Sequence, residues 1–446
     1  MSDRMRRSKV RFGGLLILAS LCHNSLADEY HYNNVLIGDR AAGMGGAYVA
    51  IADDPSGLFY NPAGVAFAGS SGFSASANAF HQTRTRYKQV LGNNDWIRRS
   101  QVLLPNFFGM IQPLGPGTAG FSYAVVDSTL EDQDQKFTDT PGPGEIADIN
   151  FNDQDNTYNI GPSYAFKVNK YFSMGLTLYG HYRKRDTIFN QQYQLLDPEY
   201  NIDPISGQRL SVTPISGNQV DTDHWQNAYI THIEYGVKPI FGIIISPVDK
   251  ISLGITVSQT VLVSSSYDKQ QGCYTTDFDG IIEDPDTFQQ SGLCQYNKVQ
   301  IEKKSHSNRR AFPLTVSTGL AYFASPSLLL STTITGYQGM NGQTQPLFNY
   351  SAGIEYYLNG QWAIRGGAFT NYANTPELSP QNSGQADHVD LFGGSLSITN
   401  FTRTTSLTLG MSASTGKGEA QVVEGNTIQQ AEVFSVTGFL STAYSF

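Results

Sequence analysis

Four basic residues lie where they could bind an anionic group. Each falls on the polar face of a segment in which apolar and polar residues alternate. A guanidinium or ammonium group in such a place can hold a carboxylate through charge-assisted hydrogen bonds. The alternative is that each pairs with an acid such as Glu234 or Glu355, or with a carboxylate of the N-terminal segment. The candidates are Arg183, Arg185, Lys238 and Arg365.

The sequence carries no recognisable catalytic or metal-binding motif. It has no Gly-x-Ser-x-Gly elbow, no His-Glu-x-x-His helix and no phosphate-binding loop. We therefore expect no catalytic residues, no metal and no cofactor, and we predict that the protein is not an enzyme. A hydrolase with a dispersed triad remains an alternative.

The last strand of the chain indicates which kind of element positions the basic residues. Phe434, Val436, Leu440, Tyr444 and Phe446 share one face, and serine and threonine residues share the other. An alternating strand that ends on an aromatic residue is typical of bacterial outer-membrane β-barrels. One face of such a strand meets lipid and the other meets a polar interior.

The start of the chain resembles a secretory signal. A basic stretch precedes residues 12–21, which are apolar but too short to span a bilayer. Small residues at 25–27 predict cleavage before Asp28, so residues 1–27 are the expected signal peptide. Cys22 leaves lipidation open, although the bulky Leu21 disfavours it. Cleavage removes five basic residues and one acidic residue from a chain of net charge −9, so no nucleic-acid partner is expected.

The composition favours one closed sheet over several soluble domains. Hydrophobic residues make up 40% of the chain, with 25 Tyr, 25 Phe and 44 Gly. After the signal, no stretch approaches the 18 or more consecutive apolar residues of a transmembrane helix. Alternating strands can instead bury one face in lipid while the average hydropathy stays low.

Period-two alternation predicts fourteen strands, and the connections between them alternate in length. Tight turns such as 169–170, 247–250 and 359–360 lie between long polar loops at 131–155, 190–228, 268–308, 372–387 and 415–431. We therefore predict an all-β, 14-stranded antiparallel transmembrane barrel with both termini in the periplasm. The predicted strands are 72–87, 102–112, 118–130, 156–168, 171–188, 229–246, 251–267, 309–323, 327–338, 348–358, 361–371, 388–399, 403–414 and 432–446.

Two cysteines remain after signal cleavage. Cys273 and Cys294 lie in the same long loop of an exported chain, which predicts a disulfide between them. Two free thiols are the alternative.

Residues 28–68 do not alternate and are rich in very small residues. Asp54 before Pro55 and Asn61 before Pro62 each resemble a helix N-cap followed by proline at the first helical position. A barrel of fourteen strands is wide enough to need filling. We expect residues 28–68 to form a compact hatch inside a barrel made by residues 69–446.

Residues 38–64, GDRAAGMGGAYVAIADDPSGLFYNPAG, resemble the N-terminal hatch of the FadL/TodX (OmpP1) family of outer-membrane transporters. These proteins carry long-chain fatty acids and aromatic hydrocarbons. Within this segment the resemblance implies hatch and gating roles for Gly43, Asp53, Asp54, Asn61, Pro62 and Ala63. Barrels of the PorV kind, which serve secretion or assembly, open with a similar segment, and the motif does not separate the two groups.

The resemblance implies passive uptake of hydrophobic compounds, gated by the hatch, with sideways exit into the bilayer. For a fatty acid, the four basic residues would be carboxylate ligands. Prolines within strands favour bulges, and we expect the side opening between Pro105 and Asp127. A closed, twisted wall is the alternative. Expected partners are hydrophobic small molecules such as fatty acids, outer-membrane lipid and the barrel-assembly machinery. The rival functions are a PorV-like accessory barrel and a general porin.

Overall fold

A computed structural model describes residues 31–446 except 33, 69–70, 92, 139–144, 198–200, 203–208, 211–218, 278–299, 308–309, 341–343 and 423–426. The predicted signal peptide, residues 1–27, lies outside the described residues. Within them, no helix is long and apolar enough to cross a bilayer.

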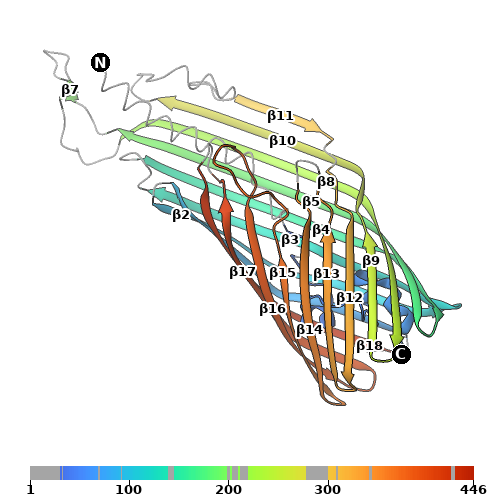
Figure 1. The fold of residues 1–446 in the computed structure, drawn as a ribbon. Helices are drawn as coiled ribbons and strands as arrows, with labels where there is room; N and C mark the ends of the chain where they lie inside the picture. The colour runs from blue at the N-terminus through green and yellow to red at the C-terminus, as the bar shows by residue number, and fades with distance from the viewer. Residues whose placement is uncertain are drawn as a thin grey trace.

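The described strands form a closed antiparallel barrel (Figure 1). The fourteen strands of the ring pair in chain order, and the first pairs with the last, so the predicted fold class is confirmed. These strands are β1 (Gly72–Leu91), β2 (Asn94–Leu114), β3 (Gly117–Thr138), β4 (Glu145–Asn169), β5 (Phe172–Asp197), β8 (Gln219–Val248), β9 (Ile251–Ser258), β12 (Thr315–Ser325), β13 (Leu328–Tyr337), β14 (Leu347–Asn359), β15 (Trp362–Asn371), β16 (His388–Phe401), β17 (Thr405–Ala420) and β18 (Gln429–Ser445).

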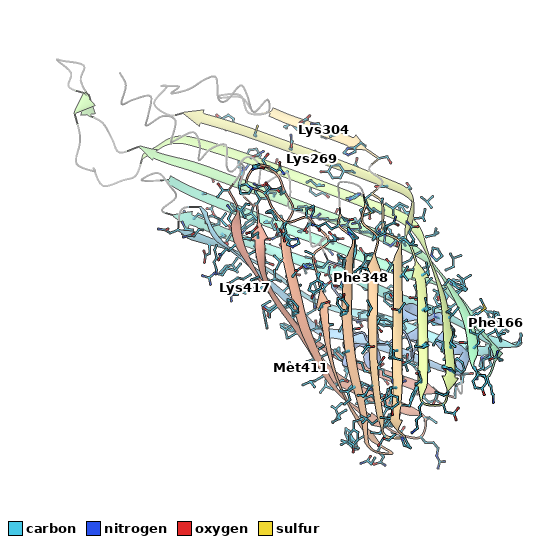
Figure 2. The ribbon with its side chains drawn as sticks, in the orientation of Figure 1. Phe166, Lys269, Lys304, Phe348, Met411 and Lys417 are labelled. Atoms are coloured by element: carbon cyan, nitrogen blue, oxygen red, sulfur yellow. The ribbon has the colours of Figure 1, made fainter. Side chains whose placement is uncertain are left out.

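Alternation along each strand separates an apolar outer surface from a largely polar inner one. Phe166, Phe348 and Met411 point outward (Figure 2) and are exposed, whereas inward residues such as Ser173 and Thr408 are buried. This distribution is the reverse of a soluble protein and is the one expected for a barrel surrounded by lipid.

The predicted strand 251–267 is wrong in one respect, because it is two strands. Residues 259–260 interrupt it. β9 therefore pairs with residues 240–248 of β8, and β10 (Val261–Asp277) pairs with residues 222–237 of the same strand. β10 also pairs with β11 (Gln300–His306), which has no counterpart among the predicted strands. The wall therefore splits beyond Ser258 and Thr315, the last residues that pair β9 with β12.

Several predicted loops are strand over most of their length. β3 runs to Thr138 and β4 starts at Glu145, so that much of the predicted loop 131–155 belongs to the sheet. The predicted loop 190–228 also contains a small hairpin of β6 (Asn201–Ile202) and β7 (Arg209–Leu210). Beyond the lipid the outward face of a strand is polar, so an apolar outward row no longer marks it, but backbone pairing with its neighbours continues.

Residues 31–68 lie inside the barrel (blue in Figure 1) and contact its inner wall. They form helices α2 (Asp39–Gly43) and α3 (Gly57–Tyr60) and the 3-10 helix η2 (Pro62–Phe67). η2 starts as the sequence predicts, with Asn61 as N-cap and Pro62 in the first turn. The helix start predicted at Pro55 is wrong by two residues, because the Asp54 carboxylate accepts a hydrogen bond from the Ser56 backbone N–H and forms a local turn.

Glycines on the inner wall allow this close contact. A Cβ atom added to Gly254 of β9 would lie 2.7 Å from the carbonyl carbon of Val49 and 2.9 Å from Cα of Ala50. Both neighbours are backbone atoms of the segment inside the barrel, so neither can move by a rotamer change.

We expect Gly254→Ala to weaken the docking of residues 31–68 by about 1–3 kcal/mol, the usual cost of overpacking. Limited proteolysis of that segment in the folded barrel measures the effect. Gly180→Ala is the matched control, because its Cβ would meet its nearest neighbour at an ordinary 3.6 Å. Equal protease resistance of the two variants would contradict the prediction.

Candidate functional site

The predicted hatch residue Asn61 joins two parts of the inner segment to the wall. Its side chain is fully buried, and its Nδ2 donates to the carbonyl oxygens of Val49 (2.8 Å) and Ile243 (3.1 Å). Its Oδ1 accepts from the backbone N–H of Ala63 at 3.1 Å. Asn61 therefore connects the turn at Val49, η2 and strand β8 through three hydrogen bonds.

An ion network holds the other end of the inner segment. Arg40 contacts Asp53 (Nη1–Oδ1 2.5 Å) and Glu355 of β14 (Nη2–Oε2 2.7 Å). Glu355 also accepts from Arg365 Nε of β15 at 2.7 Å and is fully buried. Burial opposes the charged form of Arg40, but Asp53 and Glu355 hold its pKa above the ordinary value.

Two further predicted hatch residues have distinct environments. Gly43 packs so closely on β16 that an added Cβ would overlap the Ser397 hydroxyl. Burial, and then the neighbouring charge of Asp39, raise the pKa of Asp54. Asp39 itself accepts a hydrogen bond from the Thr408 hydroxyl at 2.7 Å.

A cavity of about 710 Å³ lies between the inner segment and the wall. Leu36, Val49 and Phe59 contribute apolar surface from the inner segment, and Phe312 contributes it from the segment before β12. Polar and charged residues of β4, β5 and β8 line the same cavity.

Three of the four predicted basic residues line this cavity, and two of these are ion-paired. Arg183 Nε lies 2.9 Å from Asp155 Oδ1, and Arg185 Nε lies 2.9 Å from Asp153 Oδ1. Both arginines are almost fully buried. Their charges are therefore balanced within the wall before any ligand arrives.

Lys238 of β8 differs from the other basic residues of the cavity. Its Nζ lies 5.4 Å from the ring centroid of Phe59, a cation–π contact with the inner segment. Among the described residues, it is the one lysine or arginine of the cavity lining without a carboxylate within ion-pair distance. Lys238 can therefore accept an anion without breaking an existing ion pair.

Arg365, the fourth predicted residue, does not line the cavity. It belongs to the Arg40–Glu355 network and also donates to the Thr399 hydroxyl. Three of the four predicted residues therefore line the cavity, and the fourth contacts the network that holds the inner segment.

Sequence reasoning missed Arg310 and Phe312. Arg310 lies 2.9 Å from Glu234 (Nε–Oε1) and stacks on Phe312, with 4.5 Å between its Cζ and the ring centroid. Both were assigned to the predicted strand 309–323, but β12 starts only at Thr315. The apolar-polar spacing of residues 310–314 gave no signal that they turn into the lumen.

The wall has a break in its hydrogen-bond ladder between β2 and β3. Ser100 pairs with Glu131, and the next pair is Phe107 with Ala124. Val126 forms a bulge opposite β4. The break spans residues 101–106 of β2 and 125–130 of β3, so it overlaps the two ends of the predicted region from Pro105 to Asp127. Val126 and Asp127 also line the cavity.

Cys273 lies buried on β10 and is disulfide-bonded. Cys294 lies outside the described residues, so the pairing of these two cysteines stays a prediction. Within the described part of the chain, no group of three His, Cys, Asp or Glu side chains is placed to hold a metal ion.

No protein-family model matches the sequence. None of the curated proteins compared with it matches either. Solved structures do match over almost the whole chain. A Pseudomonas aeruginosa FadL homologue covers 92% of this chain and 98% of its own, at 16% identity and a TM-score of 0.60.

Two further solved structures give the same result. The Pseudomonas putida toluene transporter TodX matches at 10% identity and a TM-score of 0.57, and the Ralstonia pickettii toluene transporter TbuX at 12% and 0.55. Each covers 92% of this chain and 98% of its own length. The resemblance to the FadL/TodX family that residues 38–64 predict therefore extends to the whole fold, and this chain has the fold of the FadL and TodX channels.

Proposed function

We propose that the protein is an outer-membrane channel of the FadL/TodX family that passes hydrophobic compounds by diffusion. The observation that carries the proposal is the cavity between the inner segment and the wall, in a barrel matched along its length by FadL-type and toluene channels. Its volume lies within the roughly 300–1,000 Å³ usual for small-molecule sites.

A long-chain fatty acid is the ligand that the cavity supports best. The acyl chain would lie against the apolar side chains of Leu36, Val49 and Phe59, and the carboxylate would meet Lys238. A toluene-sized hydrocarbon would use the apolar surface alone and would leave Lys238 without a partner.

The exit that we propose is the break between β2 and β3. The cavity reaches this break at Val126 and Asp127, and the lipid lies on the other side of the wall. Asn106, within the break, donates to the Leu36 carbonyl oxygen at 3.0 Å. Movement of the hatch would break this hydrogen bond, and a solute would then pass into the bilayer, where it dissolves better.

An open pore for polar solutes fits the structure less well. An apolar cluster that includes Tyr87, Trp96, Phe151 and Phe189 fills part of the barrel interior between β1–β5 and β16–β18. Such a cluster excludes water. The proposal also includes a signal peptide at 1–27, a hatch at 28–68, a barrel at 69–446 and periplasmic termini.

Uptake into lipid vesicles tests the function. Vesicles that contain the protein are expected to take up labelled oleate faster than protein-free vesicles and to show no swelling in sugar solutions. Swelling with sugars but no oleate uptake would identify a porin. No transport of either solute, together with a stable complex with secretion components, would identify a PorV-like accessory barrel.

A further inference from the structure

Two arginines face each other on the outer surface of the barrel. Arg84 of β1 and Arg99 of β2 are directly opposite in the register, and both are exposed. Like charges directly opposite each other in a sheet are destabilising. In the part of the chain that the structure describes, neither side chain has a hydrogen bond or ion pair with another residue.

The neighbouring charges are already balanced. Arg86 pairs with Asp95 (Nη2–Oδ2 2.5 Å), and Glu432 accepts from Lys88 at 2.8 Å and lies 3.2 Å from Lys417 Nζ. Arg84 and Arg99 thus form no ion pair with any described residue; the nearest acid in the register is the exposed Asp132 of β3, next to the Ser100–Glu131 pair, and no ion pair joins it to Arg99.

The pair lies at the outer edge of the apolar band. On β18, Tyr444 and Phe434 mark the two ends of the apolar outward row, and Arg84 is opposite Phe434. The ten residue steps from one to the other rise by roughly 25 Å in a strand tilted by about 40°, which is the height of the apolar band of such barrels. Figure 2 shows Met411 and Lys417, both on β17, with Lys417 nearer to the end of the barrel where β10 and β11 lie.

We propose that Arg84 and Arg99 bind the phosphate of an anionic glycolipid in the outer leaflet. A phosphate between two guanidinium groups receives paired charge-assisted hydrogen bonds and removes their mutual repulsion. The acyl chains of the same lipid would lie on the apolar surface formed by Phe80, Val436 and Phe434. The site rests on the proposed outer-membrane location, but not on transport.

Native mass spectrometry of the full chain in a neutral detergent tests the site. Arg84→Gln with Arg99→Gln is expected to weaken binding of lipid A by about thirtyfold, the effect of two charges near a membrane surface. Binding of dephosphorylated lipid A is expected to stay unchanged. Arg84→Lys with Arg99→Lys keeps the charge but loses the paired hydrogen bonds, so its affinity for lipid A is expected to lie between those of the unchanged protein and the glutamine variant.

The matched control is Lys184→Gln, which removes an outward basic residue paired with Asp186. Oleate uptake by the double variant is expected to be normal, so this test is separate from the test of transport. Unchanged lipid A binding by the glutamine variant would overturn the proposal. Equal losses with phosphorylated and dephosphorylated lipid, or equally strong binding of inorganic phosphate, would also overturn it.

Discussion

Lys238→Leu is expected to weaken oleate binding by roughly 10- to 100-fold, because a hydrogen bond to a charged group contributes about 1.5–3 kcal/mol. Toluene binding is expected to stay unchanged, since a hydrocarbon offers no acceptor to the ammonium group. The barrel should tolerate the change, because Lys238 holds no ion pair with another described residue and leucine preserves an apolar contact with Phe59. Displacement of a fluorescent fatty acid measures the effect.

Two controls sharpen the Lys238 prediction. Lys238→Arg keeps the positive charge and is expected to retain oleate binding within a few fold. Lys250→Leu removes a lysine from the exposed turn between β8 and β9 and is expected to have no effect. If Lys238→Leu binds oleate normally, the carboxylate does not meet Lys238 and a hydrocarbon becomes the better ligand.

Glu355→Ala is expected to loosen the hatch. This carboxylate is fully buried and balances Arg40 of the hatch and Arg365 of the wall. Its removal leaves two guanidinium groups near each other, and breaking a buried ion pair costs about 3 kcal/mol or more. Opening of residues 40–53 should increase on the order of 100-fold, and amide hydrogen exchange of that segment measures it.

The control for Glu355 is Glu302→Gln, which removes a partly exposed carboxylate on β11 that pairs with Lys304. This variant is expected to exchange like the unchanged protein. In planar bilayers, the Glu355→Ala variant should open to ions more often than the Glu302→Gln variant or the unchanged protein. A hatch that stays as protected in Glu355→Ala as in Glu302→Gln would show that the network does not hold it.

The barrel could be predicted because lipid imposes a local rule. Every second residue of a spanning strand faces hydrocarbon, so apolar residues repeat with period two and mark the strand directly, as in β9 and β14. The rule fails outside the lipid, which explains why β3, β4 and β8 are longer than predicted. It also fails at residues 259–260, where the break arises because β8 has two different partners.

The site could be predicted only in part, because its energetics depend on neighbours in space. Alternation placed Arg183, Arg185 and Lys238 on the inner face, where the structure has them. It did not show that Asp153 and Asp155 neutralise the two arginines, since both acids lie in a predicted loop. Arg40 gave no separate signal within the hatch segment.

By itself, the sequence determined the strand pattern, the closed ring and the small-residue segment that fills it, because each depends on spacing along the chain. Only the tertiary structure decided which charges are neutralised, where the cavity lies and where the ladder is interrupted. Those features depend on pairs such as Glu355 with Arg40, which are 315 residues apart in the chain. Charge pairing acts through space, so its outcome is known only once the wall has closed around the hatch.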